Sequence, residues 1–492
     1  MPVTASGPPA SAARPTRPPR SAPKPDPARL LAWRVLRAVD AEDAYANLIL
    51  PDLLRESRLD ERDRGLVTEL TYGTLRAQGT LDHVLGLCSS RPVGDIDAPL
   101  RDALRLGAYQ LLRTRIPAHA AVAATVELVR GAIGEGPGSF ANAVLRRVAE
   151  RGGDVGAPSY DDDPIGHLAV TTAHPRWIVE EFAAGLGSDV AELAEALRAD
   201  DERPEVHLVA RPGRITRDDL MAEVAAAGLA AEPGPWTPWS VRLRGGDPAS
   251  LASVRDGRAA VQDEGSQLVA TLVAGLLPSG AAQVLDLCAG PGGKAALVAA
   301  LLAGRDDDAL VATELHEHRA RLTARAVAAG AGASASAPSW VVVTADARTA
   351  PWVAESFDLV LLDAPCTGLG ALRRRPEARW RRQPDDVVAL ASLQRELLDV
   401  AVRAVRPGGY LVYVVCSPVL AEGRHQMAWL AEQHGASLEV VDVAEHLPDL
   451  GRQPAGPGVQ LWPHRQGTDA MFLAATRVVA TLRPPSSRTG EQ

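Results

Sequence analysis

Reactive residues stand at the ends of three apolar segments of this 492-residue chain. Cys366 follows the apolar run 357–362, and Cys416 follows the run 410–415. A glycine-rich stretch, 286–294, follows a third run. In open parallel sheets, ligands bind outside the carboxyl ends of the strands. We therefore expect the three segments to form one site, in which a cofactor loop and a thiol carry out covalent catalysis on an electrophile.

The glycine-rich stretch predicts a tight loop against a cofactor. Gly290, Gly292 and Gly293 permit unusual backbone angles and the close approach of a ligand. The loop is not a phosphate-binding P-loop, because Cys288 stands where that motif has Gly and Ala295 stands where it has Ser or Thr. The glycines also fit a loose dinucleotide pattern, so a nicotinamide or flavin enzyme is one alternative.

Two acidic residues extend the expected cofactor site. Glu314 ends the next predicted strand about twenty residues after the loop, where a carboxylate can accept hydrogen bonds from two ribose hydroxyls. Asp346 ends the third strand and suits an adenine amino group, although a helix N-cap or turn residue is the alternative interpretation. Together the acids indicate an adenosine-bearing cofactor, either a dinucleotide or S-adenosylmethionine.

The two cysteines favour methyl transfer over hydride transfer. Carbon 5 of a pyrimidine becomes nucleophilic only after a group such as a thiolate adds to carbon 6. Asp363, three residues before Cys366, can support protonation of the ring at nitrogen 3. A hydride-transfer enzyme needs neither thiol. The alternative is that both cysteines are inert buried thiols.

A basic run with an embedded tryptophan follows Cys366. Such a run can hold phosphates and stack a base, although a charge run is more often a solvated face. Because it lies beside the expected thiol site, we interpret it as an RNA contact. The expected RNA-binding residues are Arg373, Arg374, Arg375, Arg379 and Trp380.

Composition limits the compartment and the partners. The chain has four cysteines and none in a CxxC pair, so we expect reduced thiols, a cytoplasmic protein and no metal site. It has no apolar run of about 18 residues, so no membrane span is expected. Its net charge of -9 means that any RNA contact must depend on local basic patches.

The pattern of apolar residues divides the chain into three folded parts and two tails. Residues 1–28 are expected to form a disordered, basic, Pro/Ala-rich tail, and residues 481–492 a disordered C-terminal tail. Helical periodicity predicts an all-α domain over 29–150. A small α+β domain is expected over 165–256. Strand–helix alternation over 257–480 predicts an α/β domain built on a parallel sheet of about seven strands.

The motifs together resemble those of the Sun family of RNA cytosine-C5 methyltransferases. The helical region resembles the NusB-like RNA-binding domain of the bacterial RsmB type, and the similar segments in the rest of the chain are 261–267, 286–294, 363–366, 375–380 and 416–418. The resemblance covers nearly the whole chain apart from the N-terminal tail. The chain has Gly290, Ala295 and Val415 where the family usually has Ala, Thr and Thr.

The resemblance implies an all-α NusB-like domain, a small α+β segment and an α/β Rossmann-like methyltransferase domain. It also implies roles for the site residues. Cys416 would be the nucleophile, Cys366 would help to release the product, and Asp363 would serve both catalysis and cofactor binding. The residues implied to bind S-adenosylmethionine are Cys288, Ala289, Gly290, Pro291, Gly292, Gly293, Lys294, Glu314, Asp346 and Asp363.

We therefore expect a monomeric enzyme that uses S-adenosylmethionine to methylate carbon 5 of a cytosine in RNA through a covalent cysteine–cytosine adduct. Small-subunit ribosomal RNA is the favoured substrate. The alternatives are a methyltransferase for cytosine in transfer RNA and a non-catalytic RNA-binding or assembly factor built on the NusB-like domain. A dinucleotide-dependent oxidoreductase is the most distant alternative.

Overall fold

The computed structural model describes residues 25–482, apart from 188, 306, 333–337, 350–351, 452 and 454–455. The chain divides into two compact units. The first contains the described part of Met1–Ala44 together with Leu50–Thr74 and Val84–Asp154, and the second contains Tyr45–Ile49, Leu75–His83 and Val155–Gln492. The expected tails, 1–28 and 481–492, lie almost wholly outside the described residues. No helix among the described residues is both long and apolar enough to cross a membrane.

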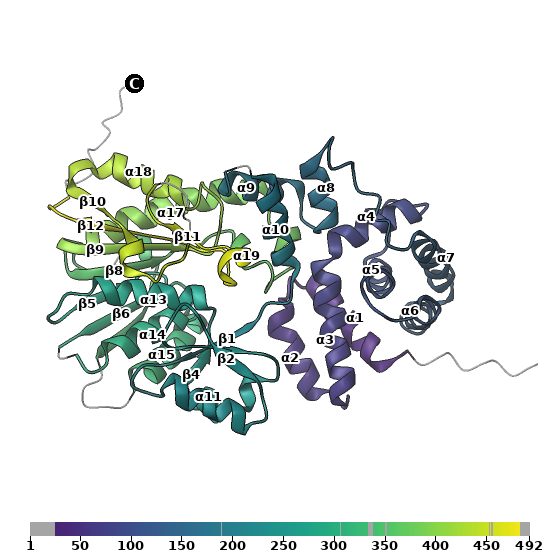
Figure 1. Cartoon of the computed structure of the whole chain (residues 1–492), viewed down its shortest axis with the longest axis horizontal. Coiled ribbons are helices and arrows are strands. Elements are labelled where there is room, and N and C mark those ends of the chain that lie inside the picture. Colours follow the sequence, from purple (N-terminus) through teal and green to yellow (C-terminus); the bar gives the residue numbers. More distant parts are fainter. Residues whose placement is uncertain are drawn as a thin grey trace, which may run out of the picture. The chain divides into compact units, whose positions relative to one another are not determined.

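Every regular element among the described residues before Val206 is a helix (Figure 1). Helix α1 begins at Pro27, two residues before the expected start at Arg29, because Asp26 caps it by accepting a hydrogen bond from Arg29 N at 2.9 Å. The first seven helices are α1 (Pro27–Ala41), α2 (Ala46–Glu56), α3 (Glu61–Arg76), α4 (Gln78–Cys88), α5 (Ala98–Arg113), α6 (Ala118–Ala132) and α7 (Glu135–Arg151).

A small antiparallel sheet follows three more helices in the second unit. Its strand order is β2-β3-β1-β4. Strand β4 lies beyond the expected domain end at 256, yet it pairs with β1 and places Val261 opposite Leu208. A strand of three residues is too short for its periodicity to be recognised in the sequence. The elements are α8 (Pro164–Thr171), α9 (Arg176–Gly185), α10 (Val190–Asp201), β1 (Val206–Ala210), α11 (Arg217–Ala226), β2 (Ala231–Pro233), β3 (Ser240–Leu243) and β4 (Ala259–Val261).

A larger sheet forms the centre of the second unit, with the order β10-β12-β9-β8-β5-β6-β7 (Figure 1). Strands β7, β6, β5, β8 and β9 run parallel, as expected. The sheet is mixed, because β12 is antiparallel to β9 and to both β10 and β11. Apolar runs report burial and not strand direction. The strands are β5 (Gln283–Asp286), β6 (Ala309–Glu314), β7 (Ser339–Thr344), β8 (Phe357–Asp363), β9 (Val405–Val415), β10 (Leu438–Val441), β11 (Val459–Gln460) and β12 (Phe472–Val478).

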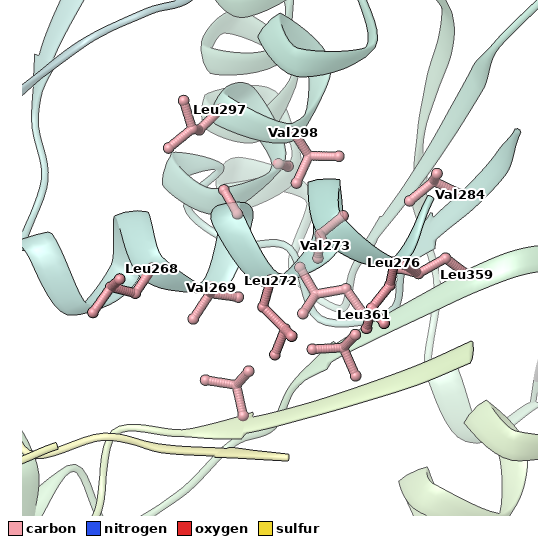
Figure 2. Packing of buried hydrophobic residues seen from close by; sticks show 14 of the residues in the cluster. Leu268, Val269, Leu272, Val273, Leu276, Val284, Leu297, Val298, Leu359 and Leu361 are labelled. Carbon is pink, nitrogen blue, oxygen red and sulfur yellow. The ribbon is translucent and has the colours of Figure 1, made fainter. Parts of the chain in front are cut away.

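Apolar clusters cover both faces of this sheet. Leu359 and Leu361 of β8 belong to one cluster, and Val360 and Leu362 belong to the other, because successive side chains of a strand point to opposite faces. Figure 2 shows the first cluster, where two helices pack on the strands. The α-helices that contribute to the clusters are α13 (Glu264–Leu276), α14 (Gly293–Leu302), α15 (Glu317–Ala331), α17 (Pro384–Ala404) and α18 (Arg424–His434).

The strand order brings the expected site residues to one edge of the sheet. The chain passes from β5 to β6 in one direction and from β8 to β9 in the other, so the connections diverge between β5 and β8. Such a switch point leaves a crevice at the carboxyl ends of the strands. Along this edge follow Asp346 after β7, Glu314 in β6, Cys288 after β5, Cys366 after β8 and Cys416 after β9.

Helices α14 and α15 (Glu317–Ala331) pack so closely that Gly330 has no room for a side chain. A Cβ there would lie 2.0 Å from the backbone oxygen of Ala296. We expect Gly330→Ala to lower the free energy of unfolding by about 1–3 kcal/mol, because the helices must move apart. Gly293→Ala is the control, since the nearest atom to its Cβ lies 3.9 Å away. Urea unfolding of both variants measures the difference, and equal stabilities would contradict it.

Candidate active site

A cavity of about 580 Å³ is lined by residues from all three reactive segments. Cys288 comes from the glycine-rich loop, Cys366 from the segment after β8 and Cys416 from the segment after β9. The carboxylates Glu314 and Asp346 line the same cavity. The fold therefore gathers both thiols and part of the expected cofactor set in one place. The expected cofactor residues that do not line the cavity are Ala289, Pro291, Gly292, Gly293 and Lys294. Several residues that come after Cys366 in the sequence also line the cavity: Thr367, Gly368, Ala371, Arg375, Ala378 and Arg382. The lining includes Tyr45 as well.

The cofactor loop requires glycine at position 292. Gly292 has a φ of 104°, a backbone conformation that residues with a side chain rarely adopt. Its Cβ would also lie 2.8 Å from Thr323 Cα on the neighbouring helix. Gly292 N donates a hydrogen bond to Ala289 O at 2.7 Å, and helix α14 begins at the next residue. The tight turn between β5 and α14 thus depends on a residue without a side chain.

Glu314 lies directly over the cofactor loop. Its carboxylate accepts a hydrogen bond from His316 N at 3.0 Å and lies 3.4 Å from the Arg319 guanidinium. Arg319 in turn donates to Gly290 O at 2.8 Å. A Cβ at Gly290 would lie 1.8 Å from Glu314 Oε2, so the glycine lets the carboxylate approach the loop backbone. Alanine at position 290 would displace the Glu314 carboxylate from this position.

Asp346 is held by its neighbour Arg348. The Arg348 side chain donates to both carboxylate oxygens, with the shortest distance 2.7 Å from Nη2 to Oδ2. The backbone N of Arg348 also donates to Oδ1 at 3.0 Å. These hydrogen bonds hold the pKa of Asp346 below its usual value. These hydrogen bonds fit the interpretation of Asp346 as a turn residue. Asp346 also lines the cavity, so it stays available to a ligand.

Three charged residues lie at the base of the loop. Lys294 Nζ donates to Asp363 Oδ2 at 2.8 Å. Burial alone would lower the pKa of Lys294, but the charge and hydrogen bond of Asp363 raise it overall, so the ammonium stays charged. Asp286 is buried, and neither of its carboxyl oxygens has a hydrogen-bond partner in the part of the chain that the structure describes. Burial, and then the charge of Asp363, raises the pKa of Asp286 to about 7.

The two thiols are in contact. Cys366 Sγ lies 3.3 Å from Cys416 Sγ, and both cysteines are free and half-buried. The hydrogen bond from Cys366 lowers the pKa of Cys416, with help from the charge of Lys294 and against the effects of burial and Asp363. The same hydrogen bond raises the pKa of Cys366, as do burial and the charge of Glu422. The hydrogen bond between the thiols, assisted by the charge of Lys294, therefore favours a thiolate on Cys416 and a neutral thiol on Cys366.

A buried carboxylate, Glu422, ties the two thiol segments together. It accepts hydrogen bonds from Thr367 N at 2.7 Å and Thr367 Oγ1 at 2.5 Å. It also accepts from Ser417 Oγ at 2.6 Å. Thr367 follows Cys366 and Ser417 follows Cys416, so one side chain sets the relative position of both cysteines. A further hydrogen bond from Gln394 Nε2 at 3.3 Å completes the environment of the carboxylate.

The basic run after Cys366 serves mainly as internal structure. Arg373 and Arg374 both donate to Asp469 Oδ1, at 3.2 and 2.9 Å, and Arg374 also pairs with Asp263 at 2.6 Å. Arg379 is completely buried and pairs with Asp201 at 2.6 Å.

Trp380 is also packed inside the second unit. A Cβ on Gly79 would lie 2.5 Å from its ring. The expectation that Arg373, Arg374, Arg379 and Trp380 contact RNA directly is therefore not supported, because their polar groups or rings already have protein neighbours. Of the five expected residues, Arg375 alone is exposed and lines the cavity.

Family models match the chain in three successive parts. The NusB family matches residues 26–150, the ferredoxin-like domain of RsmF/B-like methyltransferases matches 174–249, and the 16S rRNA methyltransferase RsmB/F model matches 273–477. Ribosomal RNA small subunit methyltransferase B of Pseudomonas putida is 35% identical over 467 residues, covering 92% of this chain and 99% of that protein. The chain belongs to the RsmB/F methyltransferase family.

Other relatives agree with this membership. Rv1407 of Mycobacterium tuberculosis, provisionally named a methyltransferase, is 50% identical over 460 residues, covering 92% of this chain and 96% of that protein. The crystal structure of PH0851 shares the fold, with a TM-score of 0.74 at 23% identity over 92% of this chain and 99% of that one. As an RsmB/F family member the protein is an S-adenosylmethionine-dependent RNA methyltransferase. The expected NusB-like, small α+β and Rossmann-like parts are confirmed.

The cavity residues fit S-adenosylmethionine. Asp286 does not itself line the cavity, but it lies at the start of the loop, and its two buried oxygens have no donor among the described residues. Such an orphaned carboxyl suits the amino group or positive charge of the cofactor. Glu314 is placed to accept hydrogen bonds from ribose hydroxyls, because it ends β6 beside Gly290. When bound, the cofactor supplies an electrophilic methyl group.

Two residues of this site were missed by sequence reasoning. Glu422 lies in a turn six residues after Cys416, and its partners become apparent only when β8 and β9 pair. Tyr45 lies more than 300 positions from the thiols, in the region predicted as a separate helical domain. A lone acid and a lone tyrosine carry no local signal of a shared site.

Glu314→Ala removes the carboxylate that lies against the cofactor loop. We expect S-adenosylmethionine binding to weaken by about 1.5–3 kcal/mol, because a charged hydrogen-bond acceptor is lost. Glu317→Ala is the matched control, since Glu317 is exposed and its one ion pair among the described residues is with Arg321 on the same helix. Calorimetry measures both affinities. An affinity equal to that of the control would reduce Glu314 to a structural carboxylate.

Glu422→Ala leaves the buried donors of Thr367 and Ser417 without an acceptor. Each such unsatisfied group costs about 1–3 kcal/mol, so the thiol segments should move apart and methyl transfer should fall steeply. Glu422→Gln keeps the acceptor for Thr367 N and should lose less activity. Cofactor affinity should change little in either variant, as in the exposed control Glu432→Ala. Full methyl transfer by folded Glu422→Ala would disprove this positioning role.

Proposed function

We propose that this protein methylates carbon 5 of a cytosine in small-subunit ribosomal RNA through a covalent adduct with Cys416. The observation that carries the proposal is the pair of free thiols 3.3 Å apart inside the cofactor cavity. The substrate is supported by relatives named ribosomal RNA small subunit methyltransferase B in Pseudomonas putida and Xylella fastidiosa.

Cys416 is the proposed nucleophile. The hydrogen bond from Cys366 and the charge of Lys294 stabilise its thiolate, which is the form that adds to carbon 6 of the ring. The new sulfur–carbon bond makes carbon 5 electron-rich, so that it can accept a methyl group. The target base must first leave its stack to reach a thiol recessed at the strand ends.

Asp363 is proposed to support the addition. Its Oδ2 is held by Lys294, while Oδ1 has no hydrogen-bond partner among the described residues. A carboxylate in this position can accept a hydrogen bond from the amino group or protonated nitrogen 3 of cytosine, which favours attack at carbon 6. The ion pair with Lys294 fixes the carboxylate while it faces the ring.

Cys366 is proposed to act after methyl transfer. Elimination removes the proton from carbon 5, breaks the bond between carbon 6 and Cys416 Sγ, and restores the aromatic ring. Cys366 Sγ lies within contact distance of Cys416 Sγ, so its neutral thiol can give a proton to the departing Cys416 sulfur, and the Cys366 thiolate formed in this way can take the proton that leaves carbon 5. The raised pKa of Cys366 suits a group that exchanges a proton and does not attack.

Other functions remain testable alternatives. A cytosine methyltransferase for transfer RNA would use the same thiols and the same cavity. A non-catalytic RNA-binding factor would not need two cysteines in contact beside a cofactor site, and both cysteines are present here. A single monomer and a cytoplasmic location remain predictions.

Bisulfite mapping tests the proposed substrate. Ribosomal RNA from cells with and without this protein should differ at one cytosine of the small-subunit RNA. The cytosine should become protected again when the purified protein and S-adenosylmethionine are added. If the cytosine methylation of ribosomal RNA did not change and that of transfer RNA did, transfer RNA would be the substrate.

The two cysteines should differ when each is replaced. Cys416→Ala cannot form the adduct and should be inactive, with no RNA cross-link. Cys366→Ala should still attack and then stall as a covalent protein–RNA complex with a methylated base, because addition and elimination are separate steps. Denaturing gel electrophoresis detects the complex, whose formation should require S-adenosylmethionine.

The opposite pattern has a definite meaning. Trapping by Cys416→Ala, with no complex from Cys366→Ala, would exchange the two roles and make Cys366 the nucleophile. Activity retained in both variants without any adduct would exclude covalent catalysis.

A further inference from the structure

The cations that line the cavity differ in whether they have a carboxylate partner. On the side of β5 to β7, Arg319 pairs with Glu314 and Arg348 pairs with Asp346. Beyond β8, Arg375 lines the cavity and forms no ion pair within 4 Å among the described residues, although it interacts electrostatically with the buried Glu377. The part of the cavity lining that comes after Cys366 in the sequence therefore carries a guanidinium without a direct carboxylate partner.

Tyr45 holds Arg375 in place. The guanidinium of Arg375 lies 5.2 Å from the centre of the Tyr45 ring, and that of Arg381 lies 5.1 Å from it. Both distances fit cation–π contacts. The backbone next to the ring is fixed as well, since Ala46 N donates to the buried Glu377 Oε1 at 3.2 Å. Tyr45 belongs to the second unit, with the thiols and the basic run.

A second arginine links this cluster to the thiol segment. Arg382 Nε donates to Thr367 O at 2.9 Å, one residue after Cys366. Arg382 lines the cavity together with Arg375 and Tyr45. Its nearest carboxylate oxygen, on Asp386, lies at the limit of an ion pair, 4.0 Å away. Two guanidiniums and a phenol ring thus border the space where a substrate base must enter to reach Cys416.

We propose that Arg375 and Arg382 bind a backbone phosphate of the nucleotide whose base enters the thiol cavity, and that Tyr45 is a positioning residue for Arg375. The proposal rests on the proposed function in that the substrate is a polynucleotide. A base that leaves its stack brings its own phosphates to the mouth of the cavity. Guanidinium groups match phosphate oxygens in charge and geometry, and a ring beneath one of them limits its motion.

Kinetics with small-subunit ribosomal RNA from cells lacking the protein test this subsite. Arg375→Ala should raise KM for RNA about five- to tenfold, while kcat and S-adenosylmethionine affinity stay within about twofold. Loss of one phosphate contact should also reduce the slope of log affinity against log salt by about 1. Arg375→Glu should weaken RNA binding further, because it repels the phosphate.

Tyr45 variants separate positioning from direct contact. Tyr45→Ala should reproduce the KM effect of Arg375→Ala, and the double variant should be little worse than either one, because the two residues act together. Tyr45→Phe keeps the ring and should behave as the unaltered protein. Additive effects in the double variant would show that Tyr45 does not act through Arg375.

Arg395→Ala is the matched control. Arg395 is exposed and lies 5.6 Å from the centre of the Trp429 ring, but it does not line the cavity. Its KM and salt slope should stay unchanged. Arg375→Ala and Arg375→Glu variants that behave like this control would overturn the phosphate subsite.

RNA binding in the absence of cofactor distinguishes this proposal from the proposed function. The salt slope is measured without any methyl transfer. If the unaltered protein made no 5-methylcytosine, the proposed function would fail, but a lower slope in Arg375→Ala would still support the phosphate subsite. If cytosine methylation occurred and the slope did not change, the subsite alone would fail.

Discussion

The chemistry of this site depends on the contact between two thiols. Each thiol lies in the segment that follows one of two neighbouring strands. Cys366 and Cys416 belong to backbone that is only partly tied by the β8–β9 ladder, because both lie beyond its last pair at Asp363 and Val414. The Glu422 carboxylate supplies the missing constraint through hydrogen bonds to the residue after each cysteine. A buried carboxylate with this many donors is rigid, since any displacement would leave several polar groups unsatisfied.

The sequence indicated that the basic run contacts RNA, but in the structure three of its arginines pair with aspartates of the protein. A buried guanidinium is stable only when paired, and the structure supplies Asp469, Asp263 and Asp201 for this purpose. The partners of Arg373 and Arg374 lie 96 and 111 positions away in the chain. The run therefore holds distant segments of the second unit together. Arg375 of the same run is exposed and lines the cavity.

The predicted helical region and the physical units do not coincide. Tyr45–Ile49 and Leu75–His83 fall within residues 26–150, which match the NusB family, yet they belong to the second unit. Arg379 donates to the backbone oxygen of Arg76, and the Trp380 ring packs on Gly79. A fragment that begins after residue 150 would lose these contacts and the Tyr45 ring of the cavity. A family model matches a continuous segment of sequence, whereas a compact unit consists of residues that pack together, so their bounds can differ.

By itself the sequence determined the strand–helix alternation, the glycine loop, and the placement of reactive residues at strand ends, and its motifs indicated the family. These features are local, because the periodicity of apolar residues and the need for glycine in a tight loop depend on only a few neighbouring residues. Only the tertiary structure decided the antiparallel direction of β12, the burial of Arg379, the role of Glu422 and the presence of Tyr45 at the cavity. Each of these depends on a partner far away in the chain, and pairing between distant residues follows from packing and charge compensation, which no local pattern records.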